Sequence, residues 1–578
     1  MKSEAVGKQL FGPQLGPDGV RFQFWAPRAK SAGVVIDDQA PLPMSQDDQG
    51  FWSVQTNAGV GALYRFEVDG ETVPDPASRF QPLDVGGPSQ VIDPSTYVWK
   101  HPEWRGRPWA ETVLYEAHVG LLGGFEGLQA RVPDLVALGV TAIELMPIGE
   151  FAGARNWGYD GVMPFAPDSA YGQPDALKVL IDQAHGLGLM VFLDVVYNHF
   201  GPDGNWLPSY APEFFDAASK TPWGAAIDFH KAAVRRFFTE NALYWLGEFR
   251  IDGLRLDAVH MILDQSWLVE MAAEVRSAFA GRHVHLVLEN ENNDAGLLRA
   301  GFDAQWNDDF HNVLHVLLTS ETHAYYRDFA DHPAERLARC LADGFIYQGE
   351  PSPNHDGRPR GQPSADLPPT AFVSFLQNHD QVGNRAFGER LTRLADPRAL
   401  KAAMGLLLLC PQIPMLFMGE EVGAREPFLF FTDFHGELAA AVRDGRRGEF
   451  AGAPGFADPK RRDAIPDPNA VGAYEASRWT DSAPDAADWR AIITDHLAVR
   501  RSDLIPRLKG ASSLGAQAVG QKAVVARWRL ADGATLTIAV NLDAEPVAAD
   551  LPDTATLIGD HSPGARLDGF TTLAWVSS

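Results

Sequence analysis

The 578-residue sequence predicts an α/β protein built around a (β/α)8 barrel, with a smaller β domain at each end. Three observations lead to this prediction. The first 95 or so residues alternate apolar and polar side chains with the period of two that is typical of half-buried strands. From Val113 onward, short apolar strand candidates alternate with helical stretches. Beyond residue 505 the period of two returns.

The N-terminal β domain is predicted over residues 1–96. Gly, Pro, Asp and Asn separate its strand candidates, as expected for turns in an antiparallel domain. The candidates are residues 20–29, 33–37, 50–56 and 62–70. A stretch rich in Pro and Trp, residues 92–113, marks the boundary with the next domain.

The barrel is predicted over residues 97–505 because eight strand candidates occur with helical segments, such as 173–188 and 264–281, between them. A doubly wound sheet is the weaker alternative, since no G-x-G-x-x-G phosphate loop lies between a strand and a helix. The eight candidates are residues 113–119, 142–148, 189–199, 253–260, 285–290, 302–307, 372–380 and 415–421.

A C-terminal β domain is predicted over residues 506–578, after a helix at 488–504. Its strand candidates are residues 523–530, 534–542 and 571–578. The longest apolar run, residues 405–419, is broken by Pro411 and Pro414 and is too short to cross a membrane. It predicts a helix, a turn and a buried strand.

Charge and cysteine content narrow the classes of function. The formal net charge of −26 repels phosphate, which argues against nucleic acid or anionic membranes as partners and favours a neutral substrate. Cys340 and Cys410 are too few for a disulfide framework and are expected to be buried free thiols. The first residues lack the apolar core of a signal peptide. We therefore expect a soluble, cytoplasmic protein.

Chemically active residue types follow several of the predicted strands at the point where each strand ends. Active sites of (β/α)8 barrels gather at this face, so we expect these side chains to share one pocket. A lone Asp at such a position is usually a helix cap, and "DVVYNH" by itself could be half of a metal site. The joint pattern favours catalysis. The residues are Asp194, Asn198, His199, Arg255, Asp257, Glu289, His379 and Asp380.

The segment "RIDGLRLDAVH", from Arg250 to His260, places charged side chains in a buried strand, where they need partners. Glycoside hydrolysis requires two carboxyl groups, one that attacks and one that protonates the leaving oxygen. Arg255 would keep a nucleophilic Asp257 ionised, while crowding by other carboxylates would keep Glu289 protonated. Asp380 could stabilise positive charge on the sugar. Asp252 precedes the strand and is expected to be a structural partner.

Four stretches resemble the signature regions of the α-amylase family of glycoside hydrolases and transglycosidases: "DVVYNH", "GLRLDAVH", "LVLEN" and "FLQNHD". The resemblance implies that Asp257 is the nucleophile, Glu289 the acid/base and Asp380 the transition-state stabiliser. It also implies that a −1 sugar site is lined by Asp194, His199, Arg255 and His379, with Tyr159 of "NWGYDG" stacking on the sugar. The third signature lacks the Gly-Glu pair of many members, and strand register selects Glu289 over Glu291.

Longer stretches, including residues 303–321, 375–391 and 418–450, resemble the subfamily of maltooligosyltrehalose trehalohydrolases. The resemblance covers nearly the whole chain and implies an immunoglobulin-like, carbohydrate-binding-module-like N-terminal β-sandwich. Val422 and Ala117 depart from residues common in this subfamily. Maltooligosyl trehalose and maltooligosaccharides are the implied substrates, made available by an upstream maltooligosyl trehalose synthase. Some α-amylase relatives bind calcium near the position of Asn198, but we expect no cofactor and no obligatory metal here.

Two alternatives stay open. A glycogen branching enzyme shares the domain plan and the catalytic set, and a non-catalytic glycan-binding protein would use only the β domains. Recognition of trehalose is expected from two loops on the catalytic face, although residues 306–309 could merely cap a helix. The candidate residues are Trp306, Asn307, Asp308, Asp309, Glu420, Glu421, Phe430 and Phe431.

Overall fold

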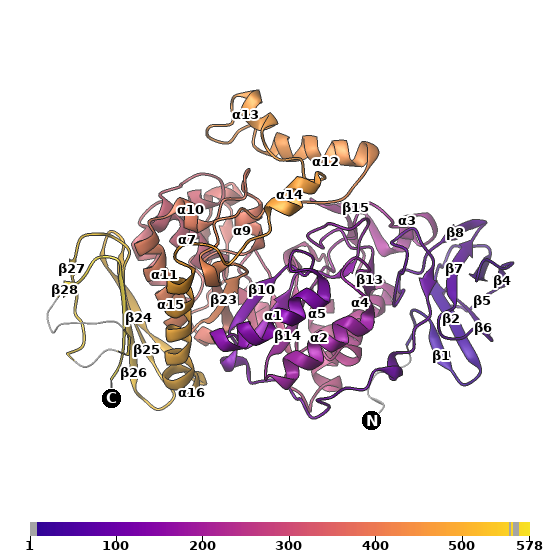
Figure 1. Cartoon of the computed structure of the whole chain (residues 1–578), viewed down its shortest axis with the longest axis horizontal. Coiled ribbons are helices and arrows are strands. Elements are labelled where there is room, and N and C mark those ends of the chain that lie inside the picture. Colours follow the sequence, from indigo (N-terminus) through magenta and orange to yellow (C-terminus); the bar gives the residue numbers. More distant parts are fainter. Residues whose placement is uncertain (1–8, 554–556, 559–565, 578) are drawn as a thin grey trace.

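The computed structural model describes residues 9–553, 557–558 and 566–577, and arranges them as three consecutive parts (Figure 1). The N-terminal β domain lies at one end of the long axis, the barrel in the middle and the C-terminal β domain at the other end. Residues 1–8, on which the expectation about a signal peptide rests, lie outside the described residues.

The central part is a closed barrel of eight parallel strands, so the predicted fold class is confirmed. All eight predicted strand segments supply one barrel strand each, in chain order, and β10 pairs with β23 to close the ring. The strands are β10 (Leu114–Ala117), β11 (Ala142–Leu145), β14 (Met190–Val195), β17 (Gly253–Leu256), β18 (His285–Leu288), β19 (Ala304–Trp306), β22 (Phe372–Phe375) and β23 (Ile413–Phe417).

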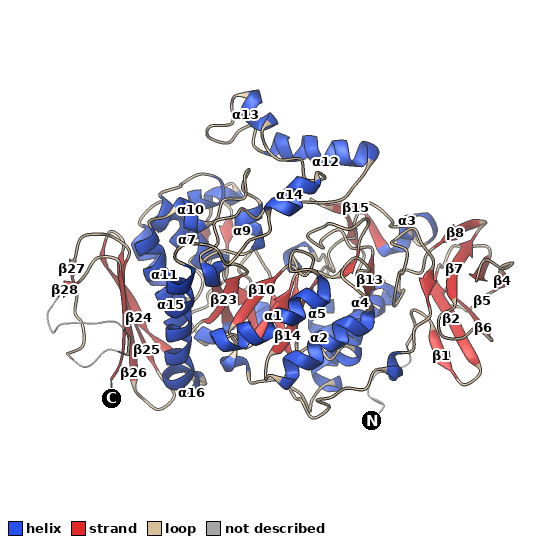
Figure 2. Cartoon of the chain, in the orientation of Figure 1, coloured by secondary structure: helices blue, strands red, loops and turns tan. Residues whose placement is uncertain are grey.

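Helices cover the outside of the barrel (Figure 2). The apolar run at 405–419 forms the end of α11 and then β23, as predicted, and Asp396 caps α11 by accepting a hydrogen bond from the backbone of Arg398. The principal helices around the strands are α1 (Gly124–Leu138), α2 (Pro174–Gly186), α4 (Ala232–Glu248), α5 (Ser266–Ala278), α7 (Asp308–Thr319), α8 (Pro333–Asp343), α11 (Pro397–Leu409) and α15 (Ala486–Val499).

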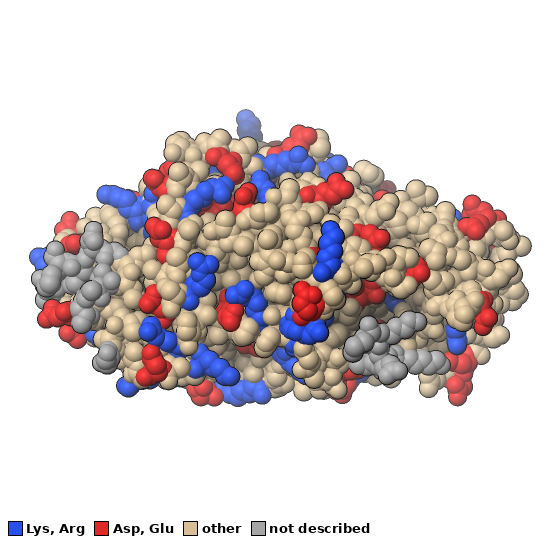
Figure 3. All heavy atoms as spheres, turned by 60° about the horizontal axis from the view of Figure 1, so that its bottom comes forward, with Lys and Arg blue, Asp and Glu red and all other residues tan. Residues whose placement is uncertain are grey.

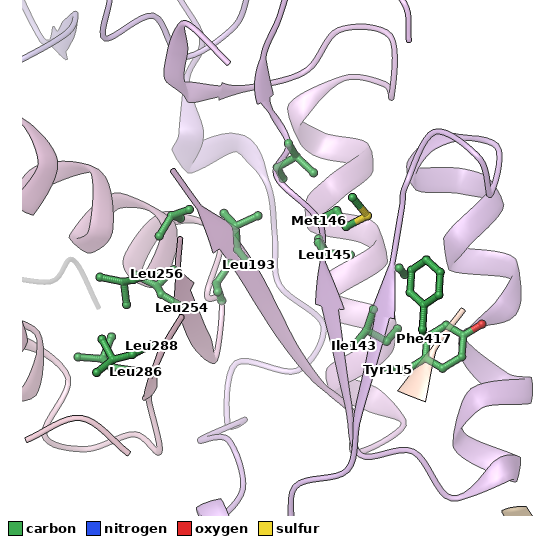
Figure 4. Packing of buried hydrophobic residues seen from close by; sticks show 14 of the residues in the cluster. Tyr115, Ile143, Leu145, Met146, Leu193, Leu254, Leu256, Leu286, Leu288 and Phe417 are labelled. Atoms are coloured by element: carbon green, nitrogen blue, oxygen red, sulfur yellow. The ribbon is translucent and has the colours of Figure 1, made fainter. Parts of the chain in front are cut away.

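Alternate strand residues fill two separate apolar layers, as the pleat of a strand requires. Residues that point into the barrel, such as Leu114, Phe192 and Val287, form one buried cluster. Residues that point outward, such as Ile143 and Leu254, pack beneath the helices (Figure 4). The barrel is therefore a packed core and not a pore.

The N-terminal domain is a β-sandwich, as predicted. One sheet has the order β1-β2-β6-β5 and the other β4-β3-β7-β8, with β9 added to β7. Rings from the two sheets meet directly: Phe24 of β2 stacks on Phe66 of β7 at 4.3 Å between centroids. The strands are β1 (Gln14–Gly16), β2 (Gly19–Trp25), β3 (Ala32–Ile36), β4 (Leu42–Pro43), β5 (Ser45–Gln46), β6 (Phe51–Thr56), β7 (Leu63–Val68), β8 (Glu71–Val73) and β9 (Ser89–Gln90).

The main sheet of the C-terminal domain contains β24 (Ser512–Gly520), β25 (Ala523–Arg529), β26 (Thr535–Asn541) and β29 (Thr571–Ser577). The sequence predicted the last three of these strands. It did not predict β24, because that strand consists mainly of small residues and its register is shifted next to Gly515, which breaks the period of two. A π-helical turn, Arg500–Leu504, links α15 to α16 (Ile505–Leu508) just before this domain.

Several smaller features bear on the expectations from sequence. Cys340 and Cys410 are buried and free, as predicted. Within the described part of the chain, no helix is both long and apolar enough to cross a membrane. On the face drawn in Figure 3, acidic and basic side chains are interspersed.

Asp252 is the structural partner that the sequence suggested. Its carboxylate is fully buried and accepts hydrogen bonds from the indole of Trp104 (2.8 Å) and the backbone of Val191 (3.0 Å), and it pairs with His185 (2.9 Å). These contacts join the linker before the barrel to α2 and β14. The side chain lies at the N-terminal end of β17, which is the end opposite the chemistry.

Removing this carboxylate is expected to destabilise the barrel strongly. Asp252→Ala leaves a buried indole N–H and a buried backbone N–H without an acceptor, which should cost about 3–5 kcal/mol of unfolding free energy. Guanidinium unfolding measures this cost. Asp134→Ala, which changes an exposed aspartate on α1, is the control and should stay within about 0.5 kcal/mol of the parent. Equal values for the two variants would contradict the structural role of Asp252.

Candidate active site

Residues from four of the barrel strands and the segments directly after them converge at one end of the barrel. Asp194 lies near the end of β14 and Arg255 near the end of β17. Asp257 and Glu289 each come just past the last residue of a strand, β17 and β18 respectively. His379 and Asp380 form the first turn of α9 (His379–Gly383), which follows β22. The predicted set therefore shares one site.

Arg255 is the centre of this site. Its guanidinium is fully buried, and Nη1 donates to both oxygens of Asp194, at 2.9 and 2.8 Å, and to Oδ1 of Asp257 at 2.6 Å. Nη2 lies 3.1 Å from Oε2 of Glu289. The indole of Trp306 lies beneath the guanidinium, 4.1 Å from its central carbon to the ring centroid. One cation thus connects three carboxyl groups.

Asp257 is held in the charged form. Burial by itself would raise the pKa of this carboxyl, but the charge of Arg255 lowers it, and the pKa ends below its usual range. The side-chain amide of Asn198 adds a hydrogen bond of 2.8 Å to Oδ2. An ionised carboxylate at this place is able to act as a nucleophile.

The pKa of Glu289 is shifted in the opposite direction. Burial raises the pKa of its carboxyl well above the usual value, and the negative charges of Asp257, Asp380 and Asp308 raise it further against the opposing charge of Arg255. Its Oε2 accepts a 2.6 Å hydrogen bond from the backbone of Ala258. Glu291, the alternative on sequence grounds, points to the rim, where it lies 3.8 Å from His260. Of the carboxyl groups around Arg255, Glu289 is therefore one that favours the protonated form.

Asp380 is the most exposed of the three carboxylates, with 38% of its side chain accessible. Its backbone is held in place because the side chain of Asn378 caps α9 and accepts a hydrogen bond from the backbone N–H of Asp380 at 2.9 Å. His379 lies 3.4 Å from its Oδ1, and the amide of Asn384 donates to the same oxygen at 3.1 Å.

His379 has a partner that the sequence reasoning missed. Glu116 of β10 is buried and accepts from the ring Nδ1 (2.5 Å) and the backbone N (3.0 Å) of His379. Although burial lowers the pKa of His379, Asp380 and Glu116 raise it to about 9, so the imidazole is charged at neutral pH. The signal in the sequence was the same as for Asp257: a charged residue inside an apolar strand, here "VLYEAHV".

Tyr159 and His199 close the base of the pocket. The phenol of Tyr159 donates to Oδ2 of Asp194 at 2.7 Å, and its half-buried ring stacks on His379 at 5.0 Å between centroids. His199 lies 3.0 Å from the carbonyl oxygen of Tyr159 through Nε2. Burial raises the pKa of Asp194 to about 7 despite the charge of Arg255.

Two of the residues expected to contact trehalose have structural roles instead. Asp309 is fully buried, and its carboxylate accepts from Asn293 and from the backbone of Ile346 and pairs with Arg360. Glu421 is also buried, bonded to the phenol of Tyr115 and the backbone of Gly419. Neither carboxylate can reach a sugar without breaking these bonds, and we correct both assignments.

The other loop residues divide between the core and the pocket. Trp306, a third residue expected to contact trehalose, is buried in the barrel interior against the guanidinium of Arg255, so this assignment is corrected as well. Phe431 is buried and Phe430 is half-buried against Trp157. Asp308 is half-buried, its carboxylate accepts from the side-chain amide of Gln381 at 3.3 Å, and burial raises the pKa of this carboxyl to about 7. Asn307 and Glu420 are buried.

Two exposed aromatic side chains near the site were not predicted. Trp223, 51% exposed, lies in the turn between β15 (Phe215–Thr221) and β16 (Gly224–Ile227) and stacks on His199 at 5.5 Å. Tyr325, 64% exposed, lies in the 3-10 helical segment Ala324–Phe329, close enough to Asp380 and Glu291 for their charges to act on its phenol. A Trp in the polar stretch "SKTPWGA" was the available signal for the first.

The described residues contain no group of three or more His, Cys, Asp or Glu side chains placed to hold a metal ion. The side-chain amide of Asn198 donates to Oδ2 of Asp257 at 2.8 Å.

Family models match all three parts of the chain. The alpha amylase catalytic domain matches residues 111–223, carbohydrate-binding module 48 (isoamylase N-terminal domain) matches residues 10–94, and a domain of unknown function, DUF3459, matches residues 511–574. These matches agree with the observed order of a β-sandwich, a barrel and a second β domain.

Relatives of known name cover most of the chain. Malto-oligosyltrehalose trehalohydrolase of Saccharolobus solfataricus is 42% identical over 76% of this chain and 80% of its own length. The enzyme of the same name from Rhizobium sp. is 36% identical over 95% of each chain. A crystal structure of an alpha amylase candidate from Salmonella typhimurium superposes with a TM-score of 0.93 at 42% identity, covering 98% of this chain and 99% of its own. The chain belongs to the malto-oligosyltrehalose trehalohydrolase family of α-amylase-type glycoside hydrolases.

Proposed function

We propose that this protein hydrolyses the α-1,4-glucosidic bond between a maltooligosaccharide and the terminal trehalose of maltooligosyl trehalose, with retention of configuration, and so releases trehalose. One observation carries the chemistry. Asp257 and Glu289 share the guanidinium of Arg255, yet the pKa of one is lowered and that of the other raised. Two carboxyl groups separated in this way supply a nucleophile and an acid.

In the proposed mechanism, Asp257 attacks the anomeric carbon of the −1 glucose and forms a covalent glycosyl-enzyme. Glu289 gives its proton to the glycosidic oxygen, and trehalose leaves. Glu289, now ionised, removes a proton from water as the water attacks the anomeric carbon, which frees the maltooligosaccharide and restores both carboxyl groups. Asp380 stabilises the positive charge that develops on the sugar ring in both steps.

Retention requires carboxyl groups about 5–5.5 Å apart, whereas inversion requires about 6.5–9.5 Å. Asp257 and Glu289 contact neighbouring nitrogens of one guanidinium, at 2.6 and 3.1 Å. Since both nitrogens belong to one planar group, this arrangement favours the closer spacing. The −1 sugar would lie against Tyr159, with Asp194, His199, Arg255 and His379 around it.

Selection of trehalose is assigned to Asp308 and the exposed aromatic rings at the rim. Trehalose bends sharply at the bond between its two anomeric carbons, so its second ring meets different side chains from those that a linear glucan would meet. Asp308 is only partly buried and lies close enough to Glu289 for its charge to add to the effect of burial on the pKa of that carboxyl. Trp223 and Tyr325 provide flat apolar surfaces on the same face.

A branching enzyme is the second candidate function. The 1,4-alpha-glucan branching enzyme of Pseudoalteromonas atlantica is 32% identical, but over only 48% of this chain and 44% of its own. The trehalohydrolases match a larger part of the chain. A purely glycan-binding role is weaker still, because Asp257, Glu289 and Asp380 are all present and positioned.

The proposed context is a cytoplasmic step that follows formation of maltooligosyl trehalose by a synthase. Two free cysteines agree with a reducing compartment. The proposed mechanism uses only carboxyl groups and the bound sugar. We therefore predict that the protein is active without an added metal.

The reaction is tested by following products with NMR. Maltooligosyl trehalose should give trehalose and a shortened maltooligosaccharide whose new reducing end is first the α anomer. Asp257→Asn, which keeps the shape but removes the nucleophilic charge, should lower turnover by roughly 10⁴-fold or more. New α-1,6 branches without trehalose would favour the branching enzyme, and a β anomer formed first would exclude retention.

A plot of kcat/KM against pH should be bell-shaped. Its acid limb should lie below, and its alkaline limb above, the pH range in which ordinary carboxyl groups titrate. Asp257 must be ionised and its pKa is lowered, so activity is lost only below the ordinary carboxyl range. Glu289 must be protonated and its pKa is raised, so activity is lost above that range. Asn198→Ala removes a donor to Asp257 and should move the acid limb alone to higher pH. Asn384→Ala, which removes a donor to Asp380, is the matched control and should leave the acid limb unchanged.

Neighbouring aspartates separate substrate selection from stability. Asp308→Ala should raise KM for maltooligosyl trehalose by about 5- to 100-fold, which corresponds to about 1–3 kcal/mol for lost hydrogen bonds, with a smaller rise for plain maltooligosaccharide. Asp309→Ala should instead lower the melting temperature, because Ile346 and Asn293 lose their acceptor. If Asp308→Ala weakened both substrates equally, Asp308 would have no part in selecting trehalose.

A further inference from the structure

A loop of the N-terminal domain reaches the barrel next to the active site. Oδ2 of Asp84 accepts a 3.0 Å hydrogen bond from the backbone of Gly153, which lies in the loop after β11. Asp84 has a left-handed backbone, with φ of 66°, and its Oδ1 accepts from the backbone of Val85 at 2.5 Å. The side chain is therefore fixed in the direction of the barrel.

Val85 fills the space beside this hydrogen bond. It is buried in a small apolar cluster with Ala152, Val162, Met163 and Ala166, all from the barrel domain. Val85 also lies against Gly204, where an added Cβ would come within 2.6 Å of it. Val85 thus packs against both the segment that carries Tyr159 and the segment that follows His199.

The loop after β23 also holds the segment that contains Gly153. Asp433 accepts from the backbone of Ala154 at 2.9 Å and forms an ion pair with Arg155. Gly153 has no side chain, and a Cβ there would lie 2.7 Å from Cβ of Asp433. Three consecutive residues, 153–155, are therefore clamped between two acidic side chains from different parts of the chain.

The clamped segment continues along the chain to Tyr159, which lies in the proposed sugar site. Two residues past Arg155, the indole of Trp157 donates to the carbonyl of Leu429 at 2.9 Å, and Tyr159 then reaches Asp194. The carbonyl of Gly161 accepts from the backbone of Gly201 at 3.1 Å, which ties this segment to the one after His199.

The described part of the N-terminal domain, residues 9–96, shows no exposed aromatic ring on which a sugar could stack. Its exposed large apolar side chains are Leu15, Leu42, Val60 and Leu83. Its two tryptophans, Trp25 and Trp52, are buried, and their indole N–H groups are bonded to backbone carbonyls.

We propose that the N-terminal domain serves the reaction by positioning the −1 subsite, with Asp84 and Val85 as the positioning residues. Asp84 fixes the segment 153–155 against Asp433, and Val85 packs against both the Tyr159 segment and the His199 segment where the two meet. The proposal depends on the proposed function only because turnover is one of its readouts.

The test compares Asp84→Ala and Val85→Ala with Asp69→Ala. Asp69 is a matched control: it also has a left-handed backbone and accepts backbone hydrogen bonds, from Lys30 and Ser31, but within its own domain. Asp84→Ala should lower kcat about 10-fold, with KM changed less than about twofold, because misplaced groups chiefly impair the chemical step. Asp69→Ala should leave kcat within about twofold of the parent.

A double variant separates positioning from general stability. Tyr159→Phe removes the bond to Asp194, and if Asp84 acts through this segment, the effects of Asp84→Ala and Tyr159→Phe on kcat should be less than multiplicative when combined. Amide hydrogen exchange of residues 149–162 should also be faster in Asp84→Ala and Val85→Ala, a readout that needs no activity and so serves for either variant.

Several results would contradict the proposal. A rise in KM for long substrates with unchanged kcat would show that the N-terminal domain binds glycan and would overturn the proposal, as would fully multiplicative effects or unchanged exchange. All variants are assayed on maltooligosaccharide as well as on maltooligosyl trehalose. Failure of the parent protein to release trehalose would then refute the proposed function while leaving the test of Asp84 intact.

Discussion

The buried guanidinium of Arg255 is the constraint on which the catalytic end of the barrel depends. Asp194, Asp257 and Glu289 are carboxyl groups removed from water, and burial raises the pKa of each. The charge of Arg255 opposes this effect for all three, but only Asp257 ends with a pKa below its usual range. Arg255 bonds to Asp194 and Asp257 on one nitrogen and approaches Glu289 with the other. Losing it would leave buried carboxylates uncompensated, which is far more costly than losing a surface ion pair.

The same cation acts differently on the two carboxyl groups proposed for catalysis. Asp257 receives a short bond from Arg255 and a second bond from Asn198, so its pKa falls. Glu289 lies farther from the cation, and burial together with the negative charges of neighbouring carboxylates raises its pKa. Position around one charged group, together with unequal hydrogen bonding, thus produces a base and an acid from two similar side chains.

The loops that complete the site depend on contacts outside the barrel strands. Tyr159 belongs to a loop held by Asp433 from the last strand's loop and by Asp84 from the N-terminal domain. Glu116 of the first strand orients His379 in the loop of the seventh. The flanking domain and the barrel are therefore joined by hydrogen bonds beside the candidate site, and the family similarity extends along nearly the full chain.

The sequence by itself determined the barrel, its eight strands and the set of polar residues that meet at their ends. This was possible because parallel strands with buried faces give continuous apolar runs, and because a charged residue within such a run must have a buried partner. Tertiary structure alone decided which loop residues face the pocket. Asp308 and Asp309 are adjacent and chemically alike, yet only the second is enclosed by Ile346, Asn293 and Arg360, which come from distant segments. Glu116 and Asp84 gained their partners in the same way, because hydrogen bonds between residues far apart in the chain follow no local period that a sequence can display.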